Sequence, residues 1–142
     1  MISWSEIARE VVRRAADRCE YCKMHQSLQG ATFHVEHIIP LAIGGISQLK
    51  NLALACPSCN LHKSDRVAAK GIDGQEEIPL FNPRIDVWEQ HFQWDEYDLI
   101  GLTAIGIATI HLLRLNDGRK IRIRQAEASF GLFPPNQFLS PN

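Results

Sequence analysis

The residues of this chain best suited to chemistry stand in the stretch FHVEHIIPLAIGG, which spans positions 33–45. It places His34, Glu36 and His37 beside an apolar run that ends in two glycines. Ionisable side chains in such surroundings need a partner or a function, because burying an unpaired charge is costly. Glu36 is a hard oxygen ligand suited to magnesium or manganese. A histidine such as His37 can act as a neutral base near physiological pH.

The four cysteines form two pairs, in CEYC and CPSC, and each pair can supply two thiolates at the spacing of a zinc knuckle. A redox-active CxxC motif would need only one pair, and structural disulfides are disfavoured where no export signal is found. We therefore predict a structural zinc site formed by Cys19, Cys22, Cys56 and Cys59. Zinc would bring the HVEH segment, which lies between the two pairs, close to the segment CNLHKSD, which starts at the second cysteine of the second pair.

Two further considerations concern this cluster of polar residues. In a strand over 33–39, His34 and Glu36 would share one face and His37 would lie on the other, because side chains alternate. Asn60 follows the second knuckle and offers an amide oxygen to the same metal as Glu36. A lone histidine is most often a packed or solvent-facing imidazole, and the neighbouring Glu36 and Asn60 favour a functional role for His37.

The elements that must position these residues follow from hydrophobic periodicity and turn signals. We predict an amphipathic helix over 4–18 with a Ser3–Glu6 capping box, strands over 33–39 and 51–56, a turn into a helix over 57–71, two short strands around a turn near Asp95 and Glu96, and a helix over 102–116. Residues 71–84 are rich in Gly, Pro and acid and indicate a surface connection. The tail from Asp117 fits either a strand or a second helix. The outline is a small α+β fold.

The bulk properties set broad limits. A chain of 142 residues fits one domain with a small appendage. No apolar run approaches the ~18 residues of a membrane span, and the N-terminus lacks the pattern of a signal peptide, so we expect a cytoplasmic protein with no membrane partner. The net charge of −1 excludes a polycation. The bases gather in three clusters, which could form a phosphate-binding face if they converge.

The order C-x2-C, EHIIPLAIGG, NL and CPSCNLHKSD resembles the HNH endonuclease motif, over residues 19 to about 70. The resemblance implies a ββα-metal, treble-clef-like core braced by the zinc knuckles, in an α+β fold with an N-terminal helix and a small C-terminal hairpin and helix extension. We place the zinc-braced nuclease domain at 1–71 and the extension, packed on the core, at 72–142.

The resemblance also implies roles for single residues. His37 matches the general base that takes a proton from the attacking water, and Asn51 matches the central asparagine that orients the loop and His37 by hydrogen bonding. Glu36, where the family more often has Asp, and Asn60 match the protein ligands of a catalytic divalent ion, with magnesium or manganese expected. Ser64 stands where some members have a further histidine ligand, so water and phosphate oxygens would complete that site.

Other residues receive weaker assignments. We expect His34 in a supporting role, and Lys63 and Arg66 as phosphate contacts, with a solvated helix face as the alternative for both cations. The segment LFNPRIDVWEQHFQW … IGLTAIGIAT is similar to a tail that follows the HNH core in a group of bacterial, notably cyanobacterial, proteins. In that group an arginine often occupies the position of Ile107.

These assignments predict a hydrolase, a metal-dependent endonuclease that cleaves phosphodiester bonds in DNA. The alternative is a zinc-stabilised nucleic-acid-binding module with a degenerate, non-cleaving site. The modest net charge and Ile107 favour the alternative, whereas the intact Glu36, His37 and Asn60 oppose it. Symmetric cleavage of both strands would need a homodimer, which the sequence leaves open.

Overall fold

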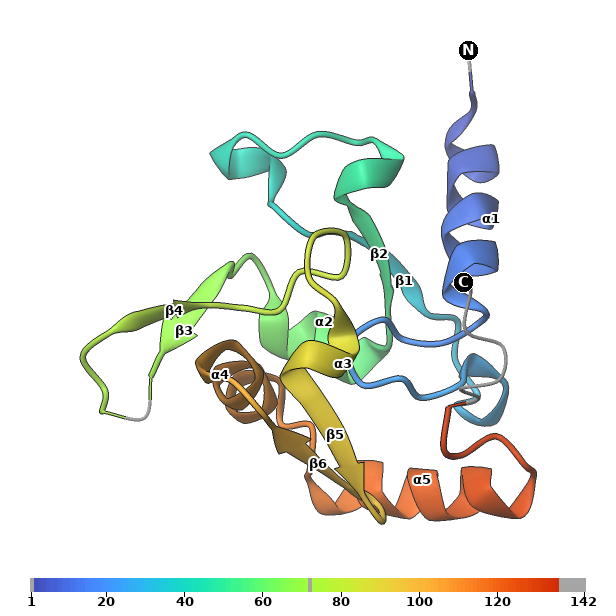
Figure 1. The fold of residues 1–142 in the computed structure, drawn as a ribbon. Helices are drawn as coiled ribbons and strands as arrows, with labels where there is room; N and C mark the ends of the chain where they lie inside the picture. Colours follow the sequence, from blue (N-terminus) through green and yellow to red (C-terminus); the bar gives the residue numbers. More distant parts are fainter. Residues whose placement is uncertain (1, 72, 136–142) are drawn as a thin grey trace.

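The computed structural model of the chain describes residues 2–71 and 73–135 (Figure 1). In chain order, its helices and strands are α1 (Trp4–Ala15), β1 (His34–His37), β2 (Leu52–Ala55), α2 (Pro57–Lys63), β3 (Ala68–Lys70), β4 (Glu77–Pro79), α3 (Trp88–His91), β5 (Phe92–Asp95), β6 (Asp98–Gly101), α4 (Ala104–Leu113) and α5 (Gly118–Ser129). The strands form three antiparallel pairs, β1–β2, β3–β4 and β5–β6. The predicted α+β class is confirmed.

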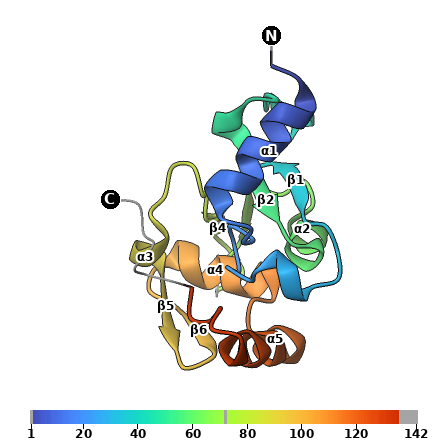
Figure 2. The ribbon, with the colours of Figure 1, turned by 90° about the vertical axis from the view of Figure 1, so that its right-hand side faces the viewer.

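Helix α1 forms where the periodicity predicts it. The predicted capping box is present, because the Ser3 side chain accepts a hydrogen bond from the Glu6 backbone N–H and the Glu6 side chain accepts one from the Ser3 backbone N–H. The helix ends at Ala15, short of the predicted end at residue 18, because Ala16 adopts a left-handed conformation with φ 54°. Its apolar face buries Val11 completely, and Figure 2 shows α1 lying along β1 and β2. The helix therefore covers the hairpin that carries the HVEH segment.

The predicted strand–strand–helix unit is confirmed as β1, β2 and α2. In the antiparallel register Glu36 pairs with Ala53 and His37 with Leu52. Every residue of β2 is buried, which suits a continuous apolar run of this length. Cys56 caps the start of α2 by accepting a hydrogen bond from the Cys59 backbone, and Pro57 occupies the first helical position. The second cysteine pair thus stands at the junction between strand and helix.

Two predictions about the middle of the chain are wrong. The helix predicted over 57–71 ends at Lys63, because Ser64 adopts a positive φ of 51° that cannot continue it. The chain then forms β3, which pairs with β4 inside the predicted surface connection, and Leu80 and Phe81 are buried. These strands are only three residues long each, and they are stabilised by pairing with each other and by packing on α4 rather than by local propensity.

The C-terminal half contains the predicted hairpin, β5 and β6, preceded by the short helix α3 that the sequence did not indicate. The predicted helix over 102–116 is α4, which crosses the middle of the molecule in Figure 2. It ends early because Arg114 is left-handed, so the buried Leu115 lies beyond the helix. Gly106 allows a close approach, since a Cβ atom there would lie 2.2 Å from the His91 carbonyl oxygen.

The ambiguous tail forms a helix, α5. Asp117 caps it by accepting a hydrogen bond from the Lys120 backbone at 2.8 Å. The buried face of α5 is polar and consists of Lys120, Arg124 and Glu127. The alternation of apolar and charged residues in IRIR is typical of a strand. The helix forms instead because Asp117 caps it and because Lys120, Arg124 and Glu127, which lie on one helical face at spacing i, i+4, i+7, are buried together.

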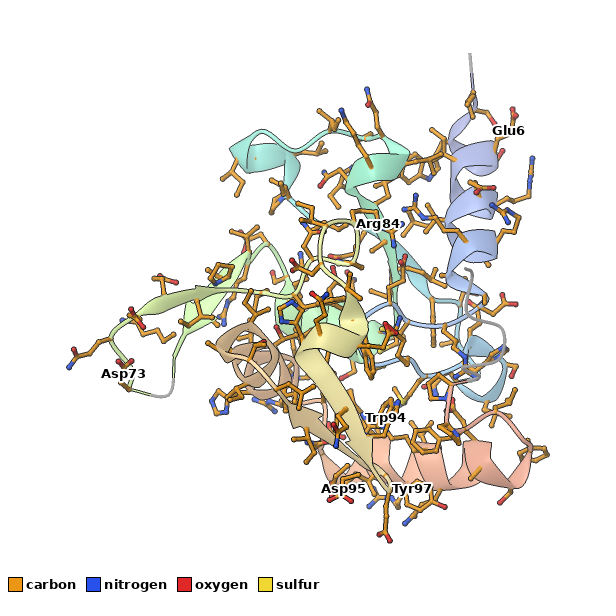
Figure 3. All side chains as sticks on the ribbon, viewed as in Figure 1. Glu6, Asp73, Arg84, Trp94, Asp95 and Tyr97 are labelled. Carbon is orange, nitrogen blue, oxygen red and sulfur yellow. The ribbon has the colours of Figure 1, made fainter. Side chains whose placement is uncertain are left out.

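The two halves of the chain contact each other extensively. Arg84, labelled in Figure 3 on the loop before α3, pairs with the knuckle residue Glu20. The Phe81 ring packs edge-on against Tyr21 with ring centroids 6.5 Å apart, and Lys120 Nζ donates to Ser58 Oγ at 2.6 Å. The division predicted after residue 71 stays a prediction. Among the described residues, no helix combines the length and apolar character needed to cross a bilayer.

Candidate functional site

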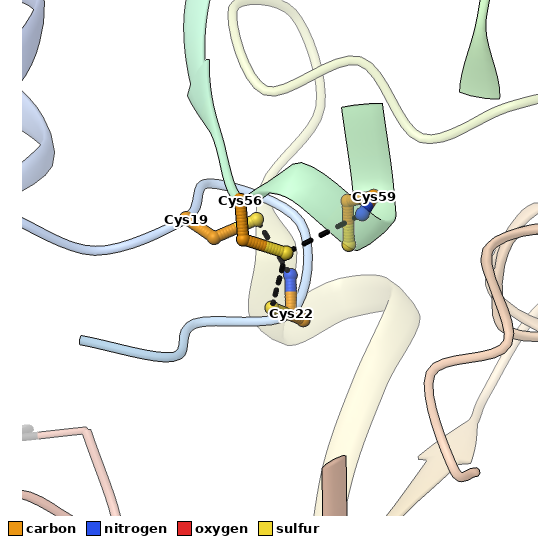
Figure 4. Close-up of side chains that lie close together, drawn as sticks. All are labelled: Cys19, Cys22, Cys56 and Cys59. Carbon is orange, nitrogen blue, oxygen red and sulfur yellow. Dashed lines mark hydrogen bonds between the residues drawn. The ribbon is translucent and has the colours of Figure 1, made fainter. Parts of the chain in front are cut away.

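The four cysteines converge on one point, as the spacing predicts (Figure 4). Their Sγ atoms all lie within 4.8 Å of one another, and those of Cys22 and Cys56 are 3.7 Å apart. A tetrahedral zinc ion with Zn–S bonds of about 2.3 Å requires sulfur–sulfur distances of about 3.8 Å. All four thiols are free and buried, so the cluster has the composition and geometry of a structural zinc site rather than of disulfides.

The electrostatics of the cluster also suit a cation. Hydrogen bonds from Cys19, Cys22 and Cys59 hold the pKa of Cys56 well below its ordinary value. Burial raises the pKa of the Cys22 thiol. Thiolates crowded in an apolar setting need a positive charge between them, because like charges cannot be buried together without compensation. A zinc ion held by the four cysteines would supply that charge and would tie the segment after α1 to the start of α2.

The two residues inside the first knuckle reach away from the cluster. Glu20 accepts a hydrogen bond from the Leu54 backbone at 2.9 Å, which joins the knuckle to β2. The Tyr21 hydroxyl donates to Oε2 of Glu36 on β1. Burial, followed by the negative charge of Glu36, raises the pKa of Tyr21 well above its ordinary value, so the phenol remains a donor. The zinc knuckle is therefore hydrogen-bonded directly to the predicted metal ligand.

Glu36 is buried, with its carboxylate contacted on both oxygens. Oε2 accepts the Tyr21 hydrogen bond, and Oε1 lies 3.2 Å from Nζ of Lys63. The side chains of Glu36 and Lys63 are only 5% and 2% exposed. Burial raises the pKa of Glu36 above its ordinary value, whereas Lys63 and Tyr21 act in the opposite direction. This ion pair is shielded from solvent at the centre of the β1–α2 interface.

Lys63 differs from its predicted role. Its Nζ also donates to the Ile38 carbonyl oxygen at 2.9 Å, and only 1% of the residue is exposed. A lysine held in this way does not present its ammonium to a phosphate at the surface. Arg66, by contrast, is exposed just beyond α2, where a phosphate contact is sterically open.

His37 ends β1 on the opposite side from Glu36, as strand alternation requires. Its Nε2 lies 2.8 Å from Ser47 Oγ, in the loop that joins β1 to β2. Its ring stacks on the exposed Trp4 of α1, with centroids 6.4 Å apart and planes inclined by 16°. The imidazole is partly exposed and thus oriented from two sides while remaining accessible to water.

Asn51 is buried and closes the loop that follows His37. Its Oδ1 accepts a hydrogen bond from the Ile39 backbone at 2.9 Å. Its Nδ2 donates to the carbonyl oxygens of Ile39 at 2.9 Å and Ile46 at 3.0 Å. One amide therefore makes three hydrogen bonds that fix both ends of the loop containing Ser47. This geometry agrees with an orienting role for Asn51 and with no direct metal contact.

The remaining candidate residues lie around this centre. Asn60 is half-buried on α2, next to Cys59, and His34 is exposed at the start of β1. Glu36 and Asn60 supply a carboxylate and an amide oxygen, which are donor types that magnesium and manganese prefer. By donor type, this pair suits a hard divalent ion, although both carboxylate oxygens of Glu36 are contacted in the structure, one by Lys63 and the other by Tyr21.

Three neighbours of the site were not singled out from the sequence: Tyr21, Ser47 and Trp4. Tyr21 stands between two zinc ligands, so its proximity to the cluster follows from the motif, but its direction toward Glu36 does not. Ser47 and Trp4 carry no motif signal, because their contacts with His37 depend on the loop path and on the docking of α1.

Comparisons with known proteins agree with this architecture. Residues 19–66 match the family model for HNH endonuclease, and this range includes both cysteine pairs, β1, β2 and α2. The chain is also similar to the Septu protein PtuB of Bacillus thuringiensis, with 26% identity over 102 residues. That match covers 70% of this chain and 37% of PtuB, so the chain spans just over a third of its relative. No solved structure matches. The sequence similarity to the HNH endonuclease family thus coincides with the cysteine-braced ββα unit, over about a third of the chain.

Proposed function

We propose that this chain is a metal-dependent endonuclease that hydrolyses phosphodiester bonds in DNA, with His37 as the general base. The match of residues 19–66 to the HNH endonuclease family model supports a nuclease activity. The observation that carries the finer proposal is the setting of His37, which is accessible at the end of β1 and oriented by Ser47 and Trp4.

We assign the reacting nitrogen of His37 from its contact with Ser47. If His37 keeps its proton on Nε2 and donates it to Ser47 Oγ, then Nδ1 carries the free lone pair. Nδ1 then accepts the proton of a water molecule as that water attacks the scissile phosphorus. Asn51 supports this arrangement by holding the loop that contains Ser47. General-base catalysis of this kind is typically worth about 100- to 10,000-fold in rate.

Glu36 and Asn60 are the proposed protein ligands of the catalytic divalent ion, magnesium or manganese. When bound, such an ion stabilises the charge that develops on the phosphate and leaving oxygens. The chain's own contribution is to carry the two oxygen donors on β1 and α2, two elements that contact each other in the fold.

Several finer assignments belong to the same proposal. Arg66 binds a DNA phosphate from the exposed segment just beyond α2, and His34 supports the site from the start of β1. Residues 72–142 form an extension packed on the 1–71 nuclease unit. The protein works in the cytoplasm, and symmetric cleavage of both strands would require a homodimer.

The test is cleavage of a supercoiled plasmid by wild type and His37→Ala, with magnesium or manganese and with EDTA after the zinc has been loaded. We expect nicked or linear product from wild type that depends on the added ion and falls at least 100-fold in the variant. Equal cleavage by both proteins would contradict the role of His37. Retained DNA binding in a gel-shift assay without cleavage by wild type would instead favour the non-cleaving binding module.

A further inference from the structure

The pairing of Glu36 with Lys63 is unusual for a carboxylate expected to bind a divalent cation. One oxygen faces the Lys63 ammonium at 3.2 Å and the other accepts the Tyr21 hydroxyl. Both partners are themselves nearly completely buried. A carboxylate so placed has its charge already compensated, and breaking the pair by removing one partner leaves an uncompensated buried charge. Any divalent ion that binds Glu36 must therefore exchange with a cation supplied by the protein.

The structure also contains space beside Lys63. A cavity of about 370 Å³ adjoins its side chain and is lined mainly by apolar residues, including Ile39, Val67 and Phe81. The same cavity is lined by Asp86, the carboxylate of which accepts a hydrogen bond from the Asn82 backbone. A lysine side chain has a flexible four-carbon stem, and this cavity, with Asp86 in its lining, is the space beside it into which its ammonium would move on leaving Glu36.

We propose that Lys63 is a built-in competitor for the divalent cation at Glu36, and that the cation must displace its ammonium to load the site. Lys63 thereby sets the concentration of divalent ion at which the site fills. This inference rests on the proposed function, because it takes Glu36 as a ligand. The physical reason is that the apparent affinity for a ligand falls in proportion to the fraction of protein that is in a binding-competent state, and the Glu36–Lys63 pair lowers that fraction.

The experiment measures Mn²⁺ binding directly, without DNA, from the loss of the free-ion electron paramagnetic resonance signal. Wild type, Lys63→Met and Glu36→Gln are compared after zinc loading, at pH 8.5 to limit proton competition. Methionine is chosen because it fills a similar volume without charge. We expect Lys63→Met to bind Mn²⁺ roughly 10- to 100-fold more tightly than wild type, the range that corresponds to one charge-assisted hydrogen bond. Glu36→Gln should lose this binding.

An unchanged or weaker affinity in folded Lys63→Met would overturn the proposal, and so would Mn²⁺ binding that survives Glu36→Gln. Zinc content and circular dichroism show whether the variants fold. If Lys63→Met does not fold, wild type is acetylated at limiting reagent with and without Mn²⁺, and the modified lysines are quantified by mass spectrometry. We expect Mn²⁺ to raise labelling of Lys63 several-fold while the exposed Lys70 is unaffected. Equal labelling of Lys63 would overturn the proposal.

Plasmid cleavage is scored separately, so that failure of this inference and failure of the nuclease proposal are distinguishable. If wild type cleaves with a dependence on His37 but Lys63→Met has unchanged Mn²⁺ affinity, only the competition is wrong. If Mn²⁺ binding follows the expected pattern but no protein cleaves DNA, the competition stands and the nuclease activity is wrong.

Discussion

Replacing Asn51 with alanine tests the link between the fold and the site. The substitution removes three hydrogen bonds, to both backbone groups of Ile39 and to the carbonyl of Ile46. A net value of about 1 kcal/mol for each hydrogen bond gives a loss of about 3 kcal/mol in the free energy of unfolding. That is a large fraction of the roughly 5–15 kcal/mol available to a small domain. We expect Asn51→Ala to remain folded at 25 °C but to be clearly less stable.

The matched control is Asn51→Asp, which preserves size and the acceptor for the Ile39 backbone. It places a carboxylate oxygen against two carbonyl oxygens, so we expect a loss at least as large as that in the alanine variant. Stability is measured by urea unfolding at one fixed concentration of free zinc, because a metal that binds the folded state shifts apparent stability. DNA cleavage should fall in both variants, since the loop holds Ser47 against His37. A loss below about 1 kcal/mol for both variants would refute the reasoning.

Three further predictions concern the metal, pH and DNA. Cys59→Ser should lose zinc and cooperative thermal unfolding, since it removes one of four ligands, and full zinc content by atomic emission would contradict this. Burial raises the pKa of Glu127 above its value in the unfolded chain, which is about 4.3. The protonated carboxyl group therefore makes its full contribution to the free energy of unfolding below about pH 4.3, and this contribution is lost as pH rises through the pKa of the folded state. Glu127→Gln should therefore gain stability relative to wild type as pH rises from about 4.3 toward 7, and urea midpoints with a constant difference would oppose this. Arg66→Ala should weaken DNA binding similarly across sequences and reduce the salt slope by about one phosphate contact, whereas an unchanged slope would exclude that contact.

The cysteine cluster and the ββα unit could be predicted from the sequence, because their signals are local. Two CxxC pairs together supply the four thiolates of one zinc site, so their spacing predicts that they meet, and the unit of β1, β2 and α2 has simple strand and cap signals. The hydrogen bonds of Asn51 agree with the orienting role that the resemblance implied. The amphipathic helix α1 followed from its capping box and its apolar face.

The remainder depends on contacts between distant segments. The helix predicted over 57–71 fails at Ser64, where backbone conformation rather than composition ends it. The strands β3 and β4 exist through their mutual pairing and the packing of α4, neither of which leaves a local pattern. The burial of Lys63 was missed for a related reason, because its partner Glu36 lies on another element and Tyr21 on a third.

The burial of a charged pair at the centre of the site has an energetic consequence. Coulomb attraction between buried partners often only offsets the cost of removing them from water, so the Glu36–Lys63 pair is weak evidence for a stabilising role. The Lys63 ammonium nevertheless holds the Glu36 carboxyl group in a sequestered state at one of its oxygens. The zinc knuckle contributes to this state through Tyr21, which holds the second oxygen.

The measurement that tests the central claim most directly is chemical rescue of His37→Gly by imidazole, in single-turnover cleavage of plasmid with saturating Mg²⁺. Glycine leaves open the space between Trp4 and Ser47 that the imidazole ring occupies. If His37 is the general base, the variant should lose about 100- to 10,000-fold in rate and recover activity in proportion to added imidazole, with wild type unaffected. A variant that cleaves at the wild-type rate, or whose deficit does not respond to imidazole, would contradict the assignment of His37 as the base.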